Sequence, residues 1–267
     1  MNAPIRRISV LIALLFTALL VSATVLQAVQ ARSLGQMTAN KRTLLDDYSR
    51  ERGAIVVDGQ NIAESVPVDD QYQWLRRYPQ GPLYSQVTGF YSYVVGAPYG
   101  LEHASNDLLS GDSDSLFVDR VTDLLTGRRT AGATIELTLN AKAQKAADEA
   151  LGDSRGAVVA LDPRTGAVLA MVSKPSFDPA RLSSFEPADI RAYYAQLNED
   201  SSDPLLNRTI SRTYPPGSTF KVVTAAAALS SGDVTTETQI PSPRELDLPQ
   251  TTAQLRNFGG SSCGADA

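Results

Sequence analysis

The longest uninterrupted apolar segment of the chain lies at its N-terminus. Arg6 and Arg7 precede it, residues 8–26 carry no charge, and the next charged residue is Arg32. An α-helix of that length spans roughly 28 Å, which matches the hydrocarbon thickness of a bilayer. The pattern therefore predicts a membrane-spanning helix within an N-terminal segment of residues 1–32.

The two arginines also predict an orientation, because basic residues stay on the cytoplasmic side of a membrane. Everything after about residue 32 would then lie outside, which predicts a single-pass protein of the cell membrane with the bulk of the chain extracytoplasmic. A cleavable signal peptide, cut near Val21-Ser22-Ala23, is the alternative. We favour the uncleaved anchor because the apolar stretch is longer than the usual core of a signal peptide. Both interpretations export the rest of the chain.

Short strand-like segments separated by turn residues follow the apolar segment. Residues 33–52 read as a polar stem, and residues 54–57 form an apolar run that ends at Asp58-Gly59. Residues 62–66 read as the partner strand, and an Asp-Gly pair between two strands indicates a hairpin. Residues 33–132 therefore predict a small β-rich domain.

Aromatic residues are concentrated in this β-rich domain. Two interpretations stay open at this point. The aromatic side chains could pack inside a core, or they could form a contact surface for a partner, since aromatic residues are enriched at interface cores. The residues concerned are Tyr72, Trp74, Tyr78, Tyr84, Tyr91, Tyr93 and Tyr99.

The pattern changes to alternating strands and helices after residue 132. Residues 134–139 alternate apolar and polar positions, as a half-buried strand does. Asn140 is a favourable N-cap for a helix over residues 141–151, which Gly152 would end. The alanines of this helix give it a small apolar face that is suited to packing on a sheet.

A hairpin and a longer polar stretch come next. Two apolar runs, residues 156–161 and 167–173, are separated by the turn-forming residues 162–166, which predicts a β-hairpin. Within the polar stretch of residues 180–213, residues 187–191 are expected to open a short helix.

The chain then passes from a turn into an alanine-rich helix. Pro216 and Gly217 cannot continue a helix backwards, so the helix is expected to begin near Ser218 and to end before Gly232. Lys221 lies one helical turn after Ser218, and side chains at i and i+3 share a helix face. This arrangement brings a hydroxyl group and an amine together at a helix N-terminus.

A serine hydroxyl becomes a good nucleophile when a neighbouring base takes its proton. Lys221 can be that base if desolvation or a nearby cation lowers its pKa. The alternative is that Ser218 only caps the helix and that Lys221 is solvated, which is the commoner meaning of an isolated S-x-x-K pattern. Ser218 and Lys221 are our candidate catalytic residues.

Composition narrows the chemistry further. The net charge of −5 argues against nucleic-acid binding, for which a basic face is expected. One cysteine, Cys263, excludes an internal disulfide and a cysteine-clustered metal site. One histidine, His103, excludes a multi-histidine metal site and lies in a polar stretch that we expect at the surface. We therefore expect no metal and no cofactor, and lysine is the economical choice of base.

Several motifs together resemble a known family. Tyr-Pro-Pro-Gly-Ser-Thr-Phe-Lys at residues 214–221 looks like the first active-site motif of penicillin-binding proteins. The predicted hairpin, Pro-Ser-Phe-Asp-Pro at residues 175–179, and Asn-Arg-Thr at residues 207–209 resemble segments of the class B high-molecular-weight enzymes. The resemblance is close to the actinobacterial penicillin-binding protein A group and extends from about residue 40 to the end.

The resemblance implies an α+β fold with three parts. Residues 1–32 would be the cytoplasmic tip and transmembrane signal-anchor, and residues 33–132 a non-catalytic pedestal or interaction domain. Residues 133–267 would form the first part of a transpeptidase domain of the serine β-lactamase-like α/β type. Arg77-Tyr78-Pro79 and Gly100-Leu101-Glu102 resemble segments of the non-catalytic domain.

The resemblance also implies a function. The implied function is that of a peptidoglycan D,D-transpeptidase, which cross-links stem peptides through a serine acyl-enzyme on Ser218 and is inhibited by penicillin. The implied partners are stem peptides, β-lactams, the membrane and a membrane-embedded glycan polymerase. Two alternatives stay open: a serine β-lactamase or carboxypeptidase, and a non-catalytic β-lactam sensor or membrane-tethered cell-wall scaffold.

Two further motifs of these enzymes, S-x-N and K-T-G or K-S-G, do not follow Lys221 in the sequence. We therefore interpret the chain as a C-terminally truncated fragment. In the family the second oxyanion donor comes from the strand that carries K-T-G, and loss of one such donor costs roughly 3 kcal/mol of transition-state stabilisation. The expectation is that these 267 residues alone bind penicillin poorly, while a longer protein is active.

Overall fold

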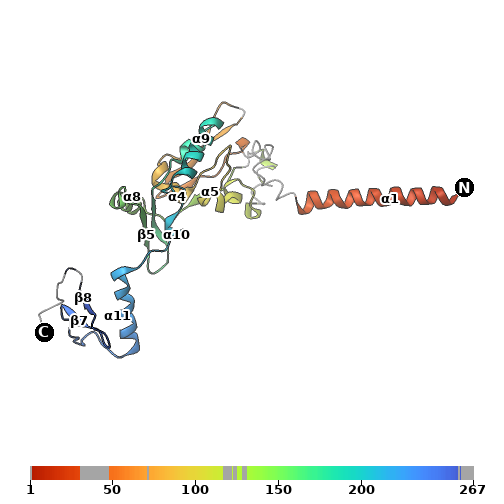
Figure 1. The fold of residues 1–267 in the computed structure, drawn as a ribbon. Coiled ribbons are helices and arrows are strands. Elements are labelled where there is room, and N and C mark those ends of the chain that lie inside the picture. Colours follow the sequence, from red (N-terminus) through yellow and green to blue (C-terminus); the bar gives the residue numbers. More distant parts are fainter. Residues whose placement is uncertain are drawn as a thin grey trace. The chain divides into compact units, whose positions relative to one another are not determined.

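A computed structural model describes residues 2–30, 48–70, 72–116, 122, 125–127, 131–257 and 259. Contacts divide the chain into two compact units, Met1–Arg212 and Thr213–Ala267, which are considered separately below (Figure 1). Most of the predicted polar stem lies outside the described residues, and so does Cys263.

The apolar N-terminal segment is helical. Helix α1 spans Asn2–Thr24 and continues into a π-helical turn, η1, at Val25–Val29. Within the described residues, Pro4–Val29 is the one segment that is long and apolar enough to cross a membrane, with a mean hydropathy of 2.5. The hydroxyl group of Thr17 donates to the carbonyl oxygen of Ala13 at 2.8 Å, so this polar side chain is satisfied within the helix. The predicted helix over residues 8–26 is confirmed.

A four-stranded sheet organises the β-rich region. Its strands are β1 (Ile55–Val57), β2 (Gln60–Pro67), β3 (Trp74–Arg77) and β4 (Ile135–Glu136), in the order β3-β2-β1-β4. Strands β1, β2 and β3 are antiparallel neighbours, whereas β4 pairs in parallel with β1. Asp58 and Gly59 have positive φ angles of 49° and 74° in the turn between β1 and β2, which confirms the predicted hairpin.

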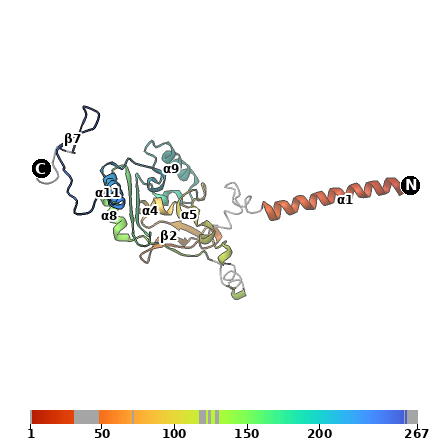
Figure 2. The same ribbon diagram turned by 90° about the horizontal axis from the view of Figure 1, so that it is seen from below.

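Short helices connect this sheet with the following segments. They are α4 (Gly81–Thr88), α5 (Gly100–Ala104), α6 (Asn106–Leu109) and the 3₁₀ turn η2 (Asp114–Leu116). Helix α4 is a central element of the first unit, because it contacts β2, α5 and the later elements α8, β6 and η3 (Figure 2).

Helix α8 and a β-hairpin follow. Helix α8 spans Ala141–Leu151, and β5 (Gly156–Leu161) pairs with the antiparallel strand β6 (Val168–Lys174). Both were predicted. The strand observed in this region is shorter than the predicted strand of residues 134–139, since only Ile135 and Glu136 pair with β1.

The N-cap of α8 gives a stability prediction. The Asn140 Oδ1 atom accepts a hydrogen bond from the Ala143 N–H at 3.0 Å, which satisfies a free donor of the first turn. Replacing Asn140 by alanine should lower the free energy of unfolding by about 1 kcal/mol. Urea unfolding followed by circular dichroism measures this change. Replacing the exposed Asn198 in the same way is the control, because that asparagine caps no helix start; equal losses for both variants would contradict the assignment.

The remaining part of the first unit is helical. It contains the 3₁₀ turn η3 (Pro179–Leu182), helix α9 (Pro187–Glu199) and the short helix α10 (Arg208–Ser211). Residues 187–191 open helix α9, as predicted, but the helix is not short, because buried Ile190, Tyr193 and Leu197 continue its apolar face to Glu199.

One hydrophobic core joins the β-rich region to the later segments. Ile55 and Val57 of β1 pack in the same cluster as Tyr84 of α4 and Ile190 of α9. A second cluster contains Tyr48, Tyr72 and Tyr91 with the partly buried Tyr93 and Phe185 packed against it. Of the aromatic residues for which two interpretations were open, Tyr72, Tyr78, Tyr84 and Tyr91 are buried, so these four side chains pack in the interior.

The second unit begins with the 3₁₀ turn η4 (Gly217–Thr219) and helix α11 (Phe220–Ser231). Strands β7 (Glu245–Asp247) and β8 (Gln254–Arg256) form a small antiparallel hairpin. The sequence analysis had not predicted this hairpin.

Candidate active site

Ser218 lies at the centre of a tight turn that leads into α11. The α-helix itself begins at Phe220, two positions later than the sequence indicated, and Ser218 belongs to the 3₁₀ turn η4. The reason is local, because the Thr219 N–H donates to the Pro216 carbonyl oxygen at 3.2 Å in an i to i+3 bond. Gly217 precedes the serine with a φ of 55°, a conformation that favours glycine.

Lys221 lies in the first turn of α11. Residues at i and i+3 lie over one another in a 3₁₀ turn and share a face of an α-helix, so the change of helix type keeps Ser218 and Lys221 on one side. Both residues are exposed, and so are Phe220 and Val222 at 56% and 71%. Within the described part of the second unit, Phe220 and Val222 therefore do not enclose Lys221 in an apolar pocket.

The end of α11 matches the expectation. Gly232 adopts the left-handed conformation with a φ of 80°, and its N–H donates to the Leu229 carbonyl oxygen at 3.3 Å. Within the described residues, no side chain of α11 is buried. The site therefore contains the Ser218 hydroxyl group and the Lys221 amine at an exposed helix start, and the free N–H groups of the first turn lie beside them.

A buried ionic cluster lies in the β-rich region, and we call it the Glu102 cluster. Glu102 of α5 is completely buried and accepts from Arg52 Nε at 2.6 Å and from Arg76 Nε at 2.6 Å. The Tyr78 hydroxyl donates to the same carboxylate at 3.1 Å and accepts from the Tyr91 N–H at 2.8 Å. The cluster ties the start of the sheet to β3 and α5.

The charges of this cluster shift its titration. Burial alone would raise the pKa of Glu102, but the guanidinium groups of Arg76 and Arg52 outweigh it and lower that pKa below its ordinary value. Burial and the Glu102 charge raise the pKa of Tyr78. Glu102 is therefore held as a carboxylate between two cations.

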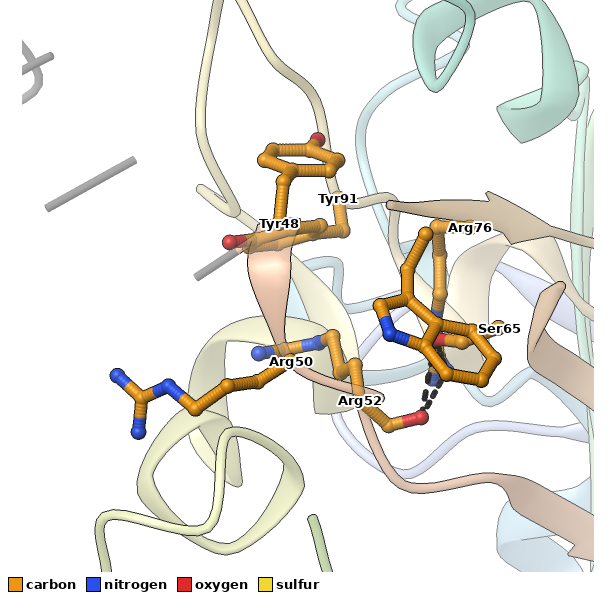
Figure 3. Close-up of a pocket in the computed structure, with 7 residues that line it drawn as sticks. Tyr48, Arg50, Arg52, Ser65, Arg76 and Tyr91 are labelled. Atoms are coloured by element: carbon orange, nitrogen blue, oxygen red, sulfur yellow. Dashed lines mark hydrogen bonds between the residues drawn. The ribbon is translucent and has the colours of Figure 1, made fainter. Parts of the chain in front are cut away.

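Figure 3 shows a small pocket beside this cluster, with Arg52 and Arg76 among the residues that line it. Arg76 Nη1 donates to the carbonyl oxygens of Arg52 and Gly53 at 3.3 and 2.8 Å, and the Arg52 guanidinium lies 4.3 Å from the centre of the Tyr91 ring. The residues that line the pocket are Tyr48, Arg50, Arg52, Ser65, Trp74, Arg76 and Tyr91.

The sequence analysis named Tyr78 and Glu102 without assigning them to an ionic cluster, and it missed Arg76. A signal was present, because successive side chains of a strand point to opposite faces, so one of the neighbours Arg76 and Arg77 had to point inward. His103 is exposed, as expected, and its Nδ1 lies 2.9 Å from the Ala97 carbonyl oxygen. Among the described residues, no group of three histidine, cysteine, aspartate or glutamate side chains is placed to hold a metal ion.

A close crossing of two glycines positions the helix that carries Glu102. Gly89 and Gly100 have φ angles of 69° and 64°. A side chain at Gly89 would collide with the carbonyl oxygen of Tyr99, and one at Gly100 would collide with the backbone at Thr88 and Gly89. Only glycine permits this approach at both positions.

Comparison with protein families gives two matches. Residues 52–135 match the family described as the penicillin binding protein A dimerisation domain. Residues 156–258 match the penicillin binding protein transpeptidase domain.

Curated relatives extend the similarity over nearly the whole chain. The peptidoglycan D,D-transpeptidase PbpA of Mycolicibacterium smegmatis is 45% identical over 99% of this chain and 54% of the relative. The peptidoglycan D,D-transpeptidase MrdA of Escherichia coli is 41% identical over 48% of this chain and 20% of the relative. The chain thus spans about half the length of the PbpA relatives it matches.

Solved structures agree with these matches. The imipenem acyl-enzyme complex of penicillin-binding protein A from M. tuberculosis has a TM-score of 0.75 at 44% identity, covering 83% of this chain and 52% of that one. PBP2 of Pseudomonas aeruginosa in complex with WCK 5153 has a TM-score of 0.60 at 30% identity, covering 80% and 48% of the two chains.

These matches, together with the S-x-x-K turn, define a class: residues 52–135 and 156–258 match two domains of penicillin-binding proteins, and the chain is similar to the class B members. Within that class it is similar to the mycobacterial penicillin-binding protein A, as the sequence motifs indicated.

Proposed function

We propose that this protein acts as a serine-type peptidoglycan D,D-transpeptidase, with Ser218 as the nucleophile and Lys221 as its base. The observation that carries the proposal is the placement of Ser218 and Lys221 three residues apart on the turn that opens α11, inside the region matching the transpeptidase family. The relatives named D,D-transpeptidase support the reaction type.

The proposed reaction has two steps. Lys221 takes the Ser218 proton, and the serine oxygen forms an ester with the carbonyl carbon of the penultimate D-alanine of a stem peptide. The amide bond to the terminal D-alanine breaks, and this residue leaves as an amine that receives the proton. An amine of a second stem peptide then attacks the ester, forms the new amide bond and returns the proton to Ser218.

Penicillin fits the same scheme, because its ring amide takes the place of the scissile bond. Attack by Ser218 opens the ring, and the leaving nitrogen stays attached to the acyl group, so it blocks the second step. Acyl-enzyme complexes of the similar M. tuberculosis protein with imipenem and penicillin G support this proposal.

The location and organisation of the chain complete the proposal. Segment Pro4–Val29 anchors the protein in the cell membrane with Arg6 and Arg7 on the cytoplasmic side, so that the rest of the chain reaches its stem peptides outside. Residues 33–132 serve as the pedestal, residues 133–267 contribute to the transpeptidase domain, and a membrane-embedded glycan polymerase supplies the strands.

The test is to incubate the protein, as the cell produces it, with fluorescent penicillin and to locate the adduct by mass spectrometry. The proposal predicts one adduct at Ser218, together with release of D-alanine when a stem-peptide substrate and an acceptor amine are supplied. An adduct without D-alanine release would indicate a β-lactam sensor, and an adduct at another residue would refute the assignment of Ser218.

Lys221 gives a quantitative prediction. Replacing Lys221 by methionine keeps the length of the side chain and removes the base, so the acylation rate should fall by about 10²- to 10⁴-fold. The acylation rate is measured by stopping the reaction with fluorescent penicillin at successive times and quantifying the labelled protein. The exposed Lys142 of α8, replaced by methionine, is the control and should leave the rate unchanged. Equal rates for both variants would remove Lys221 from the mechanism.

A further inference from the structure

The Glu102 cluster holds more positive than negative charge. Two guanidinium groups, those of Arg52 and Arg76, share the single carboxylate of Glu102, each through its Nε atom at 2.6 Å. The two arginine side chains are 6% and 1% exposed and that of Glu102 is fully buried, so salt and solvent screen these charges little. Within the described part of the chain, one positive charge of the cluster therefore has no negative partner.

The hydrogen bonds show which group carries the unmet charge. Arg52 uses every guanidinium nitrogen: Nε and Nη2 donate to the carboxylate and the carbonyl oxygen of Glu102, and Nη1 donates to Asn106 Oδ1 at 3.0 Å. Arg76 uses Nε on Glu102, and its Nη1 donates to the carbonyl oxygens of Arg52 and Gly53 at 3.3 and 2.8 Å. Arg76 Nη2 is buried and has no hydrogen-bond partner among the described residues. An unmet donor on a buried cation is costly, so this nitrogen calls for an acceptor.

Arg76 lines the small pocket shown in Figure 3, together with Trp74 and Tyr91. Three of the seven lining residues are arginines, and none is acidic. Asp112, which pairs with Arg50 at 2.9 Å, is not among them. The free space fits a group of about the size of one water molecule. A single monatomic anion suits this space better than a carboxylate or a phosphate, which carries two or more oxygen atoms.

We propose that this pocket is a binding site for a halide ion, chloride above all, held by the unmet charge and the free Nη2 donor of Arg76. Chloride supplies the one negative charge that the cluster lacks, and charge-assisted hydrogen bonds to an anion are stronger than those to a neutral acceptor. The ion would bind next to the region that matches the dimerisation family, and it would stabilise the folded form of the first unit. Every residue of the site belongs to that unit, so the inference does not depend on the proposed function.

The test is ³⁵Cl NMR of the protein as the cell produces it, because chloride that exchanges with a bound site has a broader resonance. The excess line width of wild type should saturate as chloride is added. Arg76→Met leaves Arg52 and Glu102 as a neutral pair, so its affinity for chloride should fall by about 10-fold or more. Arg77→Met is the matched control, since Arg77 is the exposed neighbour on β3, and its affinity should equal that of wild type.

Two results of the titration would overturn the proposal. A line width that rises in proportion to chloride without saturation would mean weak attraction to the surface alone. Equal losses for Arg76→Met and Arg77→Met would mean that the net charge of the protein, and not this pocket, attracts chloride.

Competition tests the kind of anion. Bromide should displace chloride at a similar concentration, whereas acetate should need about 10-fold more, and acetate that competes as well as bromide would overturn the assignment to a halide. If Arg76→Met fails to fold, wild-type crystals soaked in sodium bromide decide the location. Anomalous scattering from bromide beside Arg76 and Trp74 would support the proposal, and its absence from this pocket would overturn it.

Discussion

Replacing Ser218 by alanine should abolish covalent labelling by penicillin in the protein as the cell produces it. The hydroxyl oxygen is the atom that forms the ester, and the neighbouring Thr219 hydroxyl donates instead to the Pro216 carbonyl oxygen. Removal of a catalytic serine of this kind lowers turnover by about 10⁶-fold in serine hydrolases, which is beyond detection in a gel assay. The measurement is fluorescent penicillin labelling followed by mass spectrometry of the 214–232 peptide.

The same helix offers a matched control for this experiment. Ser230 is an exposed serine near the end of α11, so Ser230→Ala changes the same kind of side chain away from the turn. Its labelling should equal that of wild type. Undiminished labelling of Ser218→Ala would show that another residue forms the ester, and the S-x-x-K assignment would be wrong.

Replacing Glu102 by glutamine should lower the free energy of unfolding by about 3–5 kcal/mol. Glutamine has the shape of glutamate but no charge, so Arg52 and Arg76 would remain buried at 6% and 2% exposure without their counter-ion. Urea unfolding at pH 7 measures the loss. Glu136→Gln is the control, because Glu136 is exposed on β4, and a surface change of this kind stays within about 0.5 kcal/mol.

The pH dependence separates the charge of Glu102 from its packing. Its pKa is lowered in the folded state from an ordinary value of 4.5, so its contribution to stability is complete above that pH and is lost as pH falls through the lowered pKa. The difference between wild type and Glu102→Gln should therefore shrink as pH falls below 4.5. A difference that is constant with pH would mean that shape, and not charge, holds the cluster together.

Elements with strong local signals were predictable from the sequence. Helix α8 has an asparagine N-cap at one end and Gly152 at the other, and both signals depend on neighbouring residues alone. The hairpins at Asp58-Gly59 and at residues 162–166 follow from turn residues between apolar runs. Local chemistry decides such elements, so a single sequence is sufficient to find them.

Elements that depend on distant contacts were less predictable. Arg52 and Glu102 are separated by 50 residues, and no local pattern pairs them. The strand at Ile135–Glu136 is short because its length is set by the partner β1 and not by its own alternation. The β7-β8 hairpin has strands of three residues, which give hardly any periodic signal.

The candidate site divides in the same way. Ser218 and Lys221 stand close together in the sequence, so their spacing could be recognised without a fold. The 3₁₀ turn that holds Ser218 could not, because it depends on which carbonyl oxygen the Thr219 N–H selects. The contacts of Arg76 with Gly53 and Glu102 required the fold, since they join residues that are separated by 23 and 26 positions.

The shared hydrophobic core has a consequence for how such proteins diverge. Side chains of β1 and of α9, from opposite ends of the first unit, fill one cluster. Recombination between related genes at the border of the two family regions would combine segments whose side chains had not been selected to pack together. We expect such a hybrid to have voids or clashes around Ile55 and Ile190. The two family regions should therefore be inherited together, and we expect substitutions in one region to be accompanied by compensating substitutions in the other among relatives.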